Sequence, residues 1–417
     1  MDRKLNANQK FDQLAQVWFD ASVSHPSPMP LHSEGSNSRP RVLDLFCGTG
    51  GFTRGLLDSG YEVAASVDID EILTSSHSLN FPSVPLRIAD IGALSARDLI
   101  AIAGGEIDGI VGGPPCQGFS NIGKRDPSDP RRALLKCFFE LVSEIGPKFF
   151  VMENVLGLGQ TDAKRVLESA LTKLDSCYHI SAPFVLDASD YGAATTRRRL
   201  FVVGTRKDNV GQFSIQRLQT RRQAPATVAQ AIADLADPKR LTNEDGFDVW
   251  KIARRGRASN YSHLMRRTDG KFTGHLPTEH TEKVRLRFSS VPEGGVDRIG
   301  RHPRLAWNGQ CPTLRAGTGA DRGSFQSVRP IHPSEDRVIT VREAARLQGF
   351  PDDHRFHPTI WHSFRMIGNS VSPFAARAIL RELRDVLEAG DESLAASKSV
   401  SEMGACPNDS FPHSVSQ

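Results

Sequence analysis

Long apolar runs are missing from the sequence. No stretch approaches the roughly 18–20 apolar residues that a membrane-spanning helix needs, so we expect no membrane partner. Residues Met1 to Asp20 are polar and lack the apolar core and small-residue cleavage site of a secretory signal. A hydrophobic content of 39% and a charged content of 24% are ordinary for a globular protein, and we expect a cytoplasmic one.

Cysteine is scarce and scattered. The sequence contains no Cys-x-x-Cys pair and no histidine cluster at the spacing of zinc ligands. We therefore predict that the thiols are reduced and that the chain binds no metal. The six cysteines are Cys47, Cys116, Cys137, Cys177, Cys311 and Cys406.

Acidic side chains are few in one segment. Residues 205–330 contain 23 lysines and arginines against 12 aspartates and glutamates, a local charge of +11 in a chain of net charge +4. The rest of the chain therefore carries −7. A basic segment of this kind suits a polyanion-binding surface, and a solvated basic face explains the charge equally well.

Between residues 40 and 204, short β-rich runs alternate with helical patterns. This alternation predicts an α/β fold with a doubly wound, mostly parallel sheet and a binding crevice at the carboxyl ends of its strands. The expected strands are Val42–Phe46, Glu62–Ile69, Asp108–Val111, Lys148–Met152 and Leu200–Val203. The expected helices are Phe52–Ser59, Glu71–Leu79, Arg131–Ile145 and Thr161–Leu174.

The pattern changes after Gly204. Residues 205–330 are rich in Arg, Gly and Pro, with one obvious helix at Thr227–Leu235, and predict a smaller, irregular, β-leaning domain. Residues 331–389 return to the first domain. They contain a helix with a capping box at Thr340 and Glu343, and a last helix from Pro373 to about Leu387.

The two ends of the chain are predicted to lie outside these domains. Residues 1–39 read as an extension, with an amphipathic helix near Gln9–Asp20 followed by a linker rich in Ser, Pro and Gly. Residues 390–417 are rich in Ser and Glu, and we expect them to be disordered.

A glycine-rich turn follows the first expected strand. Within Asp44-Leu-Phe-Cys-Gly-Thr-Gly-Gly-Phe52, the glycines let the backbone come close to a ligand. Asp68, near the end of the second strand, could accept hydrogen bonds from ribose hydroxyls. The spacing differs from the dinucleotide-binding pattern Gly-x-Gly-x-x-Gly, so a plain tight turn is the alternative interpretation.

One cysteine lies in a stiff loop after the third expected strand. Cys116 occurs in Gly112-Gly-Pro-Pro-Cys-Gln-Gly-Phe-Ser120, where two prolines fix the backbone directly before it. An inert buried cysteine normally lies within an apolar strand or helix rather than in such a loop. We therefore predict that Cys116 is a nucleophile.

Charged residues mark two further strand ends. Glu153, in Met152-Glu-Asn-Val155, would face the same crevice, and burial there would raise its pKa and let it carry a proton. Strand alternation would place Arg197 and Arg199 on one face, where they suit a carbonyl or phosphate oxygen. An exposed glutamate and a solvated charge run are the alternatives.

The order of these motifs resembles that of the cytosine-C5 DNA methyltransferase family from about residue 41 to 385. Pro-Pro-Cys-Gln followed by Glu-Asn-Val about 37 residues later is highly specific. The segments Arg337–Pro351 and Gly368–Pro373 also match the family. The resemblance implies the class I fold of S-adenosylmethionine-dependent methyltransferases, with residues 205–330 as the target-recognition domain.

The resemblance also implies residue roles. Cys116, Glu153, Arg197 and Arg199 would be catalytic, and Thr313 and Leu314 match a Thr-Leu pair typical of the DNA-binding domain. The S-adenosylmethionine site would be formed by Phe46, Gly48, Gly50, Gly51, Asp68, Ile69, Asp90, Ile91, Leu134, Asn369 and Ser370. Three positions depart from the family pattern: Asp68 replaces Glu, Thr195 replaces Gln, and Ala89 replaces Gly.

The implied reaction begins with a target cytosine flipped out of the duplex. The thiolate of Cys116 would add to C6, while Glu153 acts at N3 and Arg199 stabilises O2. The methyl group would pass to C5, a base would remove the C5 proton, and the thiol would be eliminated. Implied partners are double-stranded DNA and a restriction endonuclease that acts on the same site, and we expect a bacterial enzyme that works as a monomer.

Three other functions were weighed. Amino-methyltransferases of adenine or cytosine resemble an Asp/Asn-Pro-Pro-Tyr/Phe pattern and need no thiol, which Gly-Pro-Pro-Cys argues against. The tRNA-directed members of the same family would share the catalytic residues, but a basic insert of this length favours duplex DNA. A DNA-binding regulator without activity is disfavoured because Cys116, Glu153 and Arg199 are all present.

Overall fold

The computed structural model describes residues 39–115, 131–159, 161–208, 210–253, 258–316 and 328–403. The described residues from Arg39 onward belong to one compact unit. The predicted N-terminal helix and Cys116 lie outside the described residues. No described helix is long and apolar enough to cross a membrane.

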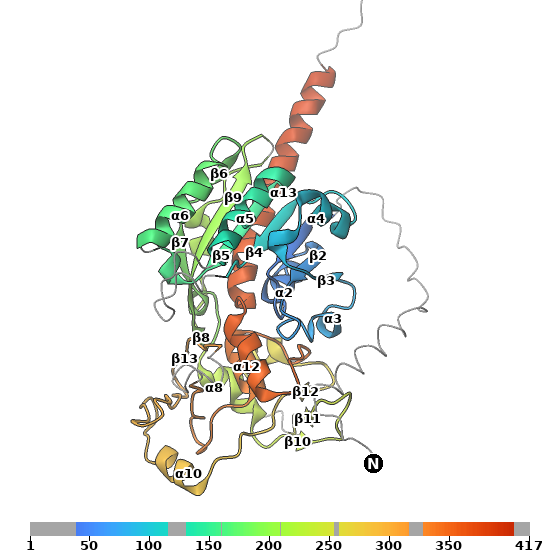
Figure 1. The fold of residues 1–417 in the computed structure, drawn as a ribbon. Coiled ribbons are helices and arrows are strands. Elements are labelled where there is room, and N and C mark those ends of the chain that lie inside the picture. The colour runs from blue at the N-terminus through green and yellow to red at the C-terminus, as the bar shows by residue number, and fades with distance from the viewer. Residues whose placement is uncertain are drawn as a thin grey trace, which may run out of the picture. The chain divides into compact units, whose positions relative to one another are not determined.

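A mixed sheet of eight strands organises the described part of the unit (Figure 1). Its order is β3-β2-β1-β4-β5-β9-β6, and β7 also pairs with β9. The five strands from β3 to β5 are parallel, whereas β9 runs antiparallel to β5, β6 and β7. The strands are β1 (Arg41–Leu45), β2 (Glu62–Asp68), β3 (Leu86–Ile88), β4 (Gly109–Gly112), β5 (Phe149–Asn154), β6 (Tyr178–Ile180), β7 (Phe184–Asp187) and β9 (Arg198–Arg206).

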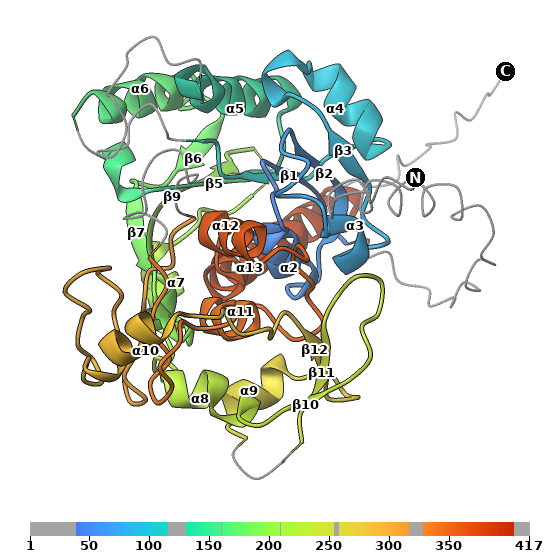
Figure 2. The same cartoon turned by 60° about the horizontal axis from the view of Figure 1, so that its bottom comes forward.

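Helices cover both faces of this sheet (Figure 2). Alternate strand residues face opposite sides, so Leu43 joins a core with α4, α5 and α6, while Val42 joins a core with α2 and α13. The doubly wound, mostly parallel sheet predicted from the sequence is confirmed. The helices are α2 (Gly51–Leu57), α3 (His77–Asn80), α4 (Ala96–Ala103), α5 (Arg131–Ile145), α6 (Thr161–Thr172) and α13 (Pro373–Met403), with 3-10 turns η1 (Ile91–Ala93), η2 (Leu156–Gly159) and η3 (Ala188–Asp190).

The remaining described segments contain short elements. Three strands form a small antiparallel sheet, and β8 and β13 form a separate parallel pair. The strands are β8 (Thr195–Thr196), β10 (Lys239–Arg240), β11 (Val249–Lys251), β12 (Lys271–Thr273) and β13 (Cys311–Pro312). The helices are α7 (Ile215–Thr220), α8 (Val228–Ile232) with η4 (Ala233–Leu235), α9 (Asn260–Met265), α10 (Glu282–Ser289), α11 (Val341–Gln348) and α12 (Ile360–Asn369).

The predicted helix Glu71–Leu79 is wrong, because only His77–Asn80 is helical in this stretch. Hydroxyl groups satisfy the backbone locally: Thr74 Oγ1 donates to the carbonyl of Asp70 at 2.9 Å, and Ser75 Oγ donates to that of Ile72 at 2.8 Å. Side-chain bonds of this kind compete with a regular helix.

The predicted ends of the last helix and of the ordered chain also need correction. The last helix, α13, does not stop near Leu387 but continues to Met403, so residues 390–403 are helical rather than disordered. Leu394, Ala395 and Ala396 favour a helix, and this propensity outweighs the local serines. Residues 404–417 lie outside the described part of the chain.

Candidate active site

The glycine-rich turn lies at the carboxyl end of β1 and leads directly into α2. Its backbone is unusual because Phe46, Gly48 and Gly50 have φ of 59°, 51° and 89°. A Cβ at Gly50 would lie 2.3 Å from Phe81, and one at Gly51 would lie 2.3 Å from the carbonyl oxygen of Val371. A Cβ at Gly48 would meet nothing within 4 Å. The turn is therefore packed against protein at Gly50 and Gly51 and open at Gly48.

Asp68, at the end of β2, holds this turn. Its Oδ2 accepts a hydrogen bond from the amide of Gly48 at 2.8 Å, and its Oδ1 accepts one from Asp70 at 2.9 Å. Burial is the main cause of the raised pKa of Asp68. The next side chain, Ile69, is 61% exposed although it is large and apolar. A carboxylate followed by an uncovered aliphatic group suits a ligand with a ribose and a flat base.

A second group of predicted residues lies along η1 and α5. The Asp90 carboxylate accepts a hydrogen bond from the Gly92 amide at 2.9 Å and caps η1. Leu134 of α5 lies next to Gly92, since a Cβ on Gly92 would be 3.2 Å from a Leu134 methyl group. Ile91 is buried in the core beside α5. Leu134 is therefore close to the Asp90–Ile91 segment, although the two are more than 40 residues apart in sequence.

The C-terminal part of the chain reaches the same turn. The contact between Gly51 and Val371 puts the Asn369–Ser370 segment next to the start of α2. Asn369 is exposed, whereas Ser370 is buried and donates to the carbonyl of Ile367 at 2.8 Å. The structure thus brings together the predicted residues from both ends of the domain.

Glu153 is the last residue but one of β5 and is a buried carboxylate. Arg199 of β9 forms an ion pair with it, with 3.0 Å between Nε and Oε1. Burial raises the pKa of Glu153, and the opposing effects of Arg199 and Arg197 are smaller. Because Glu153 is buried in the structure, the alternative interpretation of an exposed glutamate is wrong.

The neighbouring Asn154 connects β5 to the proline-rich loop. Its Nδ2 donates to the carbonyl of Pro114 at 3.0 Å, and its Oδ1 accepts from the amide of Val155 at 2.9 Å. Gly113 also approaches Glu153, since a Cβ there would lie 3.2 Å from Oε2. The described part of the loop before Cys116 is therefore held beside the Glu153 carboxylate.

The two arginines of the Arg-x-Arg motif have different surroundings. Arg197 is 2% exposed and donates to the carbonyls of Leu314, Gly368 and Ser370 at 3.1, 2.9 and 2.7 Å. Arg199 is half-buried and pairs with Glu153. Arg198, between them, is exposed. Arg197 therefore ties three chain segments together, while Arg199 faces the carboxylate.

The Thr-Leu pair lies close to these arginines. Thr313 Oγ1 donates to the carbonyl of Thr196 at 2.6 Å, and the carbonyl of Leu314 is bound by Arg197. Thr195, which replaces the usual Gln, donates from Oγ1 to the carbonyl of Cys311 at 3.0 Å. In this chain, Thr195 thus helps to join β8 to β13.

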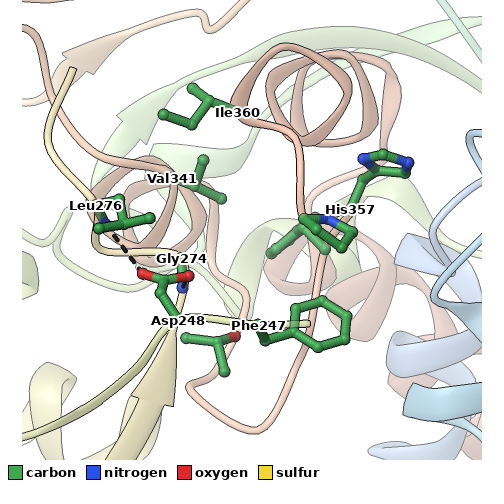
Figure 3. Close-up of a pocket in the computed structure, with 10 residues that line it drawn as sticks. Phe247, Asp248, Gly274, Leu276, Val341, His357 and Ile360 are labelled. Atoms are coloured by element: carbon green, nitrogen blue, oxygen red, sulfur yellow. Dashed lines mark hydrogen bonds between the residues drawn. The ribbon is translucent and has the colours of Figure 1, made fainter. Parts of the chain in front are cut away.

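A separate hollow lies between the small sheet and the α11–α12 region (Figure 3). Its carboxylate, Asp248, accepts hydrogen bonds from the amides of Gly274, His275 and Leu276 at 2.9, 2.7 and 3.0 Å. Trp250 Nε1 donates to it as well, at 2.7 Å. Asp248 is therefore fully engaged in holding a turn, and the hollow contains none of the predicted site residues. Among the described residues, no cluster of His, Cys, Asp or Glu could hold a metal.

Sequence reasoning missed three side chains that shape the site. Asn154 was part of a recognised motif but was given no role. Thr49 and His354 bond to each other at 3.0 Å behind the glycine-rich turn. The sequence indicated Thr49 only as a polar residue within a glycine-rich turn. It could not show that its partner lies 305 residues away.

Comparisons with known proteins agree with this geometry. The family model of C-5 cytosine-specific DNA methylases matches residues 40–385. The type II methyltransferase M.XorII of Xanthomonas oryzae pv. oryzae is 40% identical over 387 residues, covering 86% of this chain and 90% of the relative. The type II methyltransferase M.DdeI of Desulfomicrobium norvegicum is 30% identical over 378 residues, covering 82% and 88%.

Solved structures show the same fold. A prophage-encoded protein of E. coli, described as a DNA modification methyltransferase, has a TM-score of 0.73 and 36% identity, covering 84% of this chain and 99% of that one. The Dnmt2 methyltransferase of S. pombe has a TM-score of 0.56 at 19% identity, covering 84% and 99%, and supports the fold alone. The chain belongs to the C-5 cytosine-specific DNA methylase family.

Proposed function

We propose that this cytosine-C5 DNA methyltransferase acts through Cys116, Glu153 and Arg199 on a specific sequence in double-stranded DNA. The observation that carries the proposal is the bond from Asn154 to the carbonyl of Pro114, two residues before Cys116. This bond holds the Gly113–Pro114 backbone beside a buried glutamate that is paired with an arginine. A nucleophile, a proton carrier and a cation at one strand edge are what addition to a pyrimidine ring requires.

Glu153 is suited to act as a proton carrier at N3 of the target cytosine. Burial raises its pKa, which is the direction that helps a carboxyl group to carry a proton to N3 and so to stabilise the charge that develops when the thiolate adds to C6. Arg199 is held at 3.0 Å from Glu153, so its remaining N–H groups can donate to the cytosine O2 oxygen. Arg197 has its donors directed at three backbone carbonyls, so we assign it a positioning role rather than contact with the base.

We assign the donor site to the edge formed by β1, β2, η1 and α5. S-adenosylmethionine is the methyl donor of this family and supplies the methyl group. The open space at Gly48, the Asp68 carboxylate and the exposed Ile69 fit a nucleoside. Phe46, Gly50 and Gly51 shape the turn, and Asp90, Ile91, Leu134, Asn369 and Ser370 complete its surroundings. Asp68 is shorter than the usual Glu but is already fixed by the amide of Gly48.

We assign residues 205–330 to target recognition, with residues 40–204 and 331–389 forming the catalytic domain. Support comes from a rigid, basic projection around α10. Arg304 is buried and donates to Asp336 at 2.7 Å and to the carbonyl of Phe288 at 2.6 Å, which fixes the projection. The exposed side chains that it presents include Arg285, Leu286, Arg298, Ile299 and Arg301. Guanidiniums with no ion-pair partner among the described residues, beside exposed aliphatic groups, suit phosphates and base edges.

This projection is connected directly to the candidate active site. The chain runs from Arg304 through β13 to Leu314, whose carbonyl is bound by Arg197. We therefore place Thr313 and Leu314 at the junction between DNA binding and catalysis. The relatives are bacterial type II methyltransferases, so we propose a bacterial cytoplasmic modification enzyme whose target is shared with a restriction endonuclease.

The proposed nucleophile can be tested with Cys116→Ser. We expect methylation of DNA to be lost while the Kd for S-adenosylmethionine stays close to that of the wild type. DNA with 5-fluorocytosine at the target should trap the wild-type enzyme covalently, because fluorine cannot leave as a proton does. A variant with undiminished turnover, or tight DNA binding without any adduct, would show that Cys116 does not attack C6.

Two further experiments define the substrate. Bisulfite sequencing of DNA from cells that express the enzyme would identify the methylated sequence. Labelled donor offered with either duplex DNA or tRNA separates the proposed substrate from that of the tRNA-directed relatives. Transfer to tRNA alone would overturn the assignment to DNA.

A further inference from the structure

The turn that carries the candidate donor site needs support from behind. Phe46 adopts a left-handed conformation that is unfavourable for a residue with a Cβ, and Gly48 and Gly50 adopt it too. Asp68 holds the β2 side of the turn through Gly48. Because the Gly48 side of the turn is open, any further contact that holds the turn must come from the side on which Thr49 is buried.

His354 provides a contact on that buried face. Its Nε2 lies 3.0 Å from Thr49 Oγ1, and both side chains are 1% exposed. The imidazole is enclosed by Phe81, Phe350 and Phe356, with ring centroids 5.7, 4.6 and 4.8 Å away. A buried polar pair in an aromatic cage has no water to replace a lost partner.

The orientation of the imidazole is fixed by Asn80. The amide of Asn80 binds the backbone of Arg355 twice, with Oδ1 accepting and Nδ2 donating, both at 2.8 Å. The same Nδ2 lies 3.1 Å from Nε2 of His354. Asn80 Nδ2 and Thr49 Oγ1 thus both lie within hydrogen-bonding distance of Nε2, while Nδ1 of the same ring is buried with no hydrogen-bond partner among the described residues.

The backbone of His354 is fixed as well. Arg342 of α11 is buried and donates to the carbonyl of His354 at 2.7 Å and to that of Pro351 at 2.8 Å. Its Nε donates to the carbonyl of Thr273, in β12, at 3.0 Å. The histidine is thus a rigid anchor connected to the small sheet, rather than a side chain that follows the movements of the turn.

We propose that His354 is a positioning residue for the donor site. Through its hydrogen bond with Thr49, it fixes the Phe46–Gly50 backbone in the shape that S-adenosylmethionine contacts. This inference rests on the proposed placement of the donor at that turn. It predicts that the His354–Thr49 bond controls affinity for the donor and leaves the chemical step unchanged.

The test compares His354→Leu with His354→Gln. Leucine keeps a similar volume but cannot accept a hydrogen bond, whereas the glutamine carboxamide can place an oxygen near the position of Nε2. His275→Leu is the matched control, because His275 is also buried and bonds to a threonine hydroxyl, that of Thr340, at 3.0 Å. Thr49→Val removes the same bond from the other side and is available if His354→Leu does not fold.

The readouts are the Kd for S-adenosylmethionine by calorimetry without DNA, KM and kcat, and Tm. Loss of one buried hydrogen bond should raise Kd and KM for the donor about tenfold for His354→Leu, with kcat at saturating donor within about twofold of the wild type. His354→Gln should recover most of the affinity. His275→Leu should lower Tm without changing Kd.

Two results would overturn the inference. One is a wild-type Kd in His354→Leu and Thr49→Val. The other is a change in Kd for His275→Leu as large as that for His354→Leu, which would mean general destabilisation. If the wild-type enzyme itself bound no S-adenosylmethionine, the proposed donor site would fail instead, so the two failures are distinguishable.

Discussion

We expect the replacement of Arg197 with methionine to act mainly by lowering the free energy of unfolding. Its effect on the electrostatics at Glu153 should be secondary. The side chain is 2% exposed, and its donors satisfy the carbonyls of Leu314, Gly368 and Ser370. Methionine has a similar length but no donor, so the carbonyls of Leu314 and Gly368 would lose the donor that Arg197 supplies, and that of Ser370 would keep only Gln348 Nε2, at 3.3 Å.

The size of the effect follows from these contacts. Each buried carbonyl without its donor costs about 1–3 kcal/mol. Part of this loss is offset, because the guanidinium itself is costly to bury, and its burial lowers the pKa of Arg197 well below the usual range. We expect a net loss of about 3 kcal/mol in the free energy of unfolding.

The assay is urea unfolding at pH 7, monitored by tryptophan fluorescence, together with single-turnover methylation. Arg199→Met is the matched control, because Arg199 is half-buried and faces Glu153 rather than a set of carbonyls. It should lose methylation rate with a smaller loss of stability than Arg197→Met, because it removes one ion pair rather than three contacts to buried carbonyls. Wild-type stability in Arg197→Met, combined with a large loss of rate, would refute the positioning role and restore Arg197 as a catalytic residue.

Two other predictions concern charge. Burial raises the pKa of Asp44 to about 7, so its contribution to stability is fully present below its unfolded pKa of about 3.9 and is lost as the pH rises through 7. Asp44→Asn should therefore flatten the fall in stability between pH 4 and 7 in urea titrations, and an unchanged profile would contradict this. Arg298→Ala with Arg301→Ala should weaken DNA binding and reduce the slope of log Kd against log salt by about 1–2. Arg97→Ala with Arg165→Ala, which removes two exposed charges elsewhere, should leave that slope unchanged, and equal slopes for both pairs would exclude the α10 projection as a phosphate-binding surface.

The sequence was most informative where local pattern and burial agree. The parallel strands are short apolar runs followed by turn residues, and Arg131–Ile145 has a clear helical period; the structure contains both, the helix with the predicted bounds. The same logic placed Glu153 at a strand end, where the structure buries it. These features depend on residues close together in the chain, so pattern alone could reveal them.

Other features depend on contacts between distant residues. A solvated run was one of two interpretations of the three consecutive arginines, and Arg197 is buried because it meets carbonyls 117 to 173 residues further along the chain. The helix α10 carries charge on most of its surface and buries only Phe288, so no apolar stripe indicated it. The short edge strands β6 and β7 owe their pairing to β9 and not to a strong pattern of their own.

The packing of α13 against α2 affects how the chain can fold during synthesis. Gly55 of α2 lies against Ala376, and the hydroxyl of Tyr61 donates to the carbonyl of Leu380 at 2.9 Å, across 319 residues. The first βαβ unit therefore cannot complete its core until nearly the whole protein has left the ribosome. Until then the apolar surface of this unit stays exposed or is bound by a chaperone. Forming a contact between residues so far apart in sequence is also slow. A nascent chain halted at residue 330 should accordingly bind no S-adenosylmethionine, even though it already contains β1, β2 and the turn between β1 and α2.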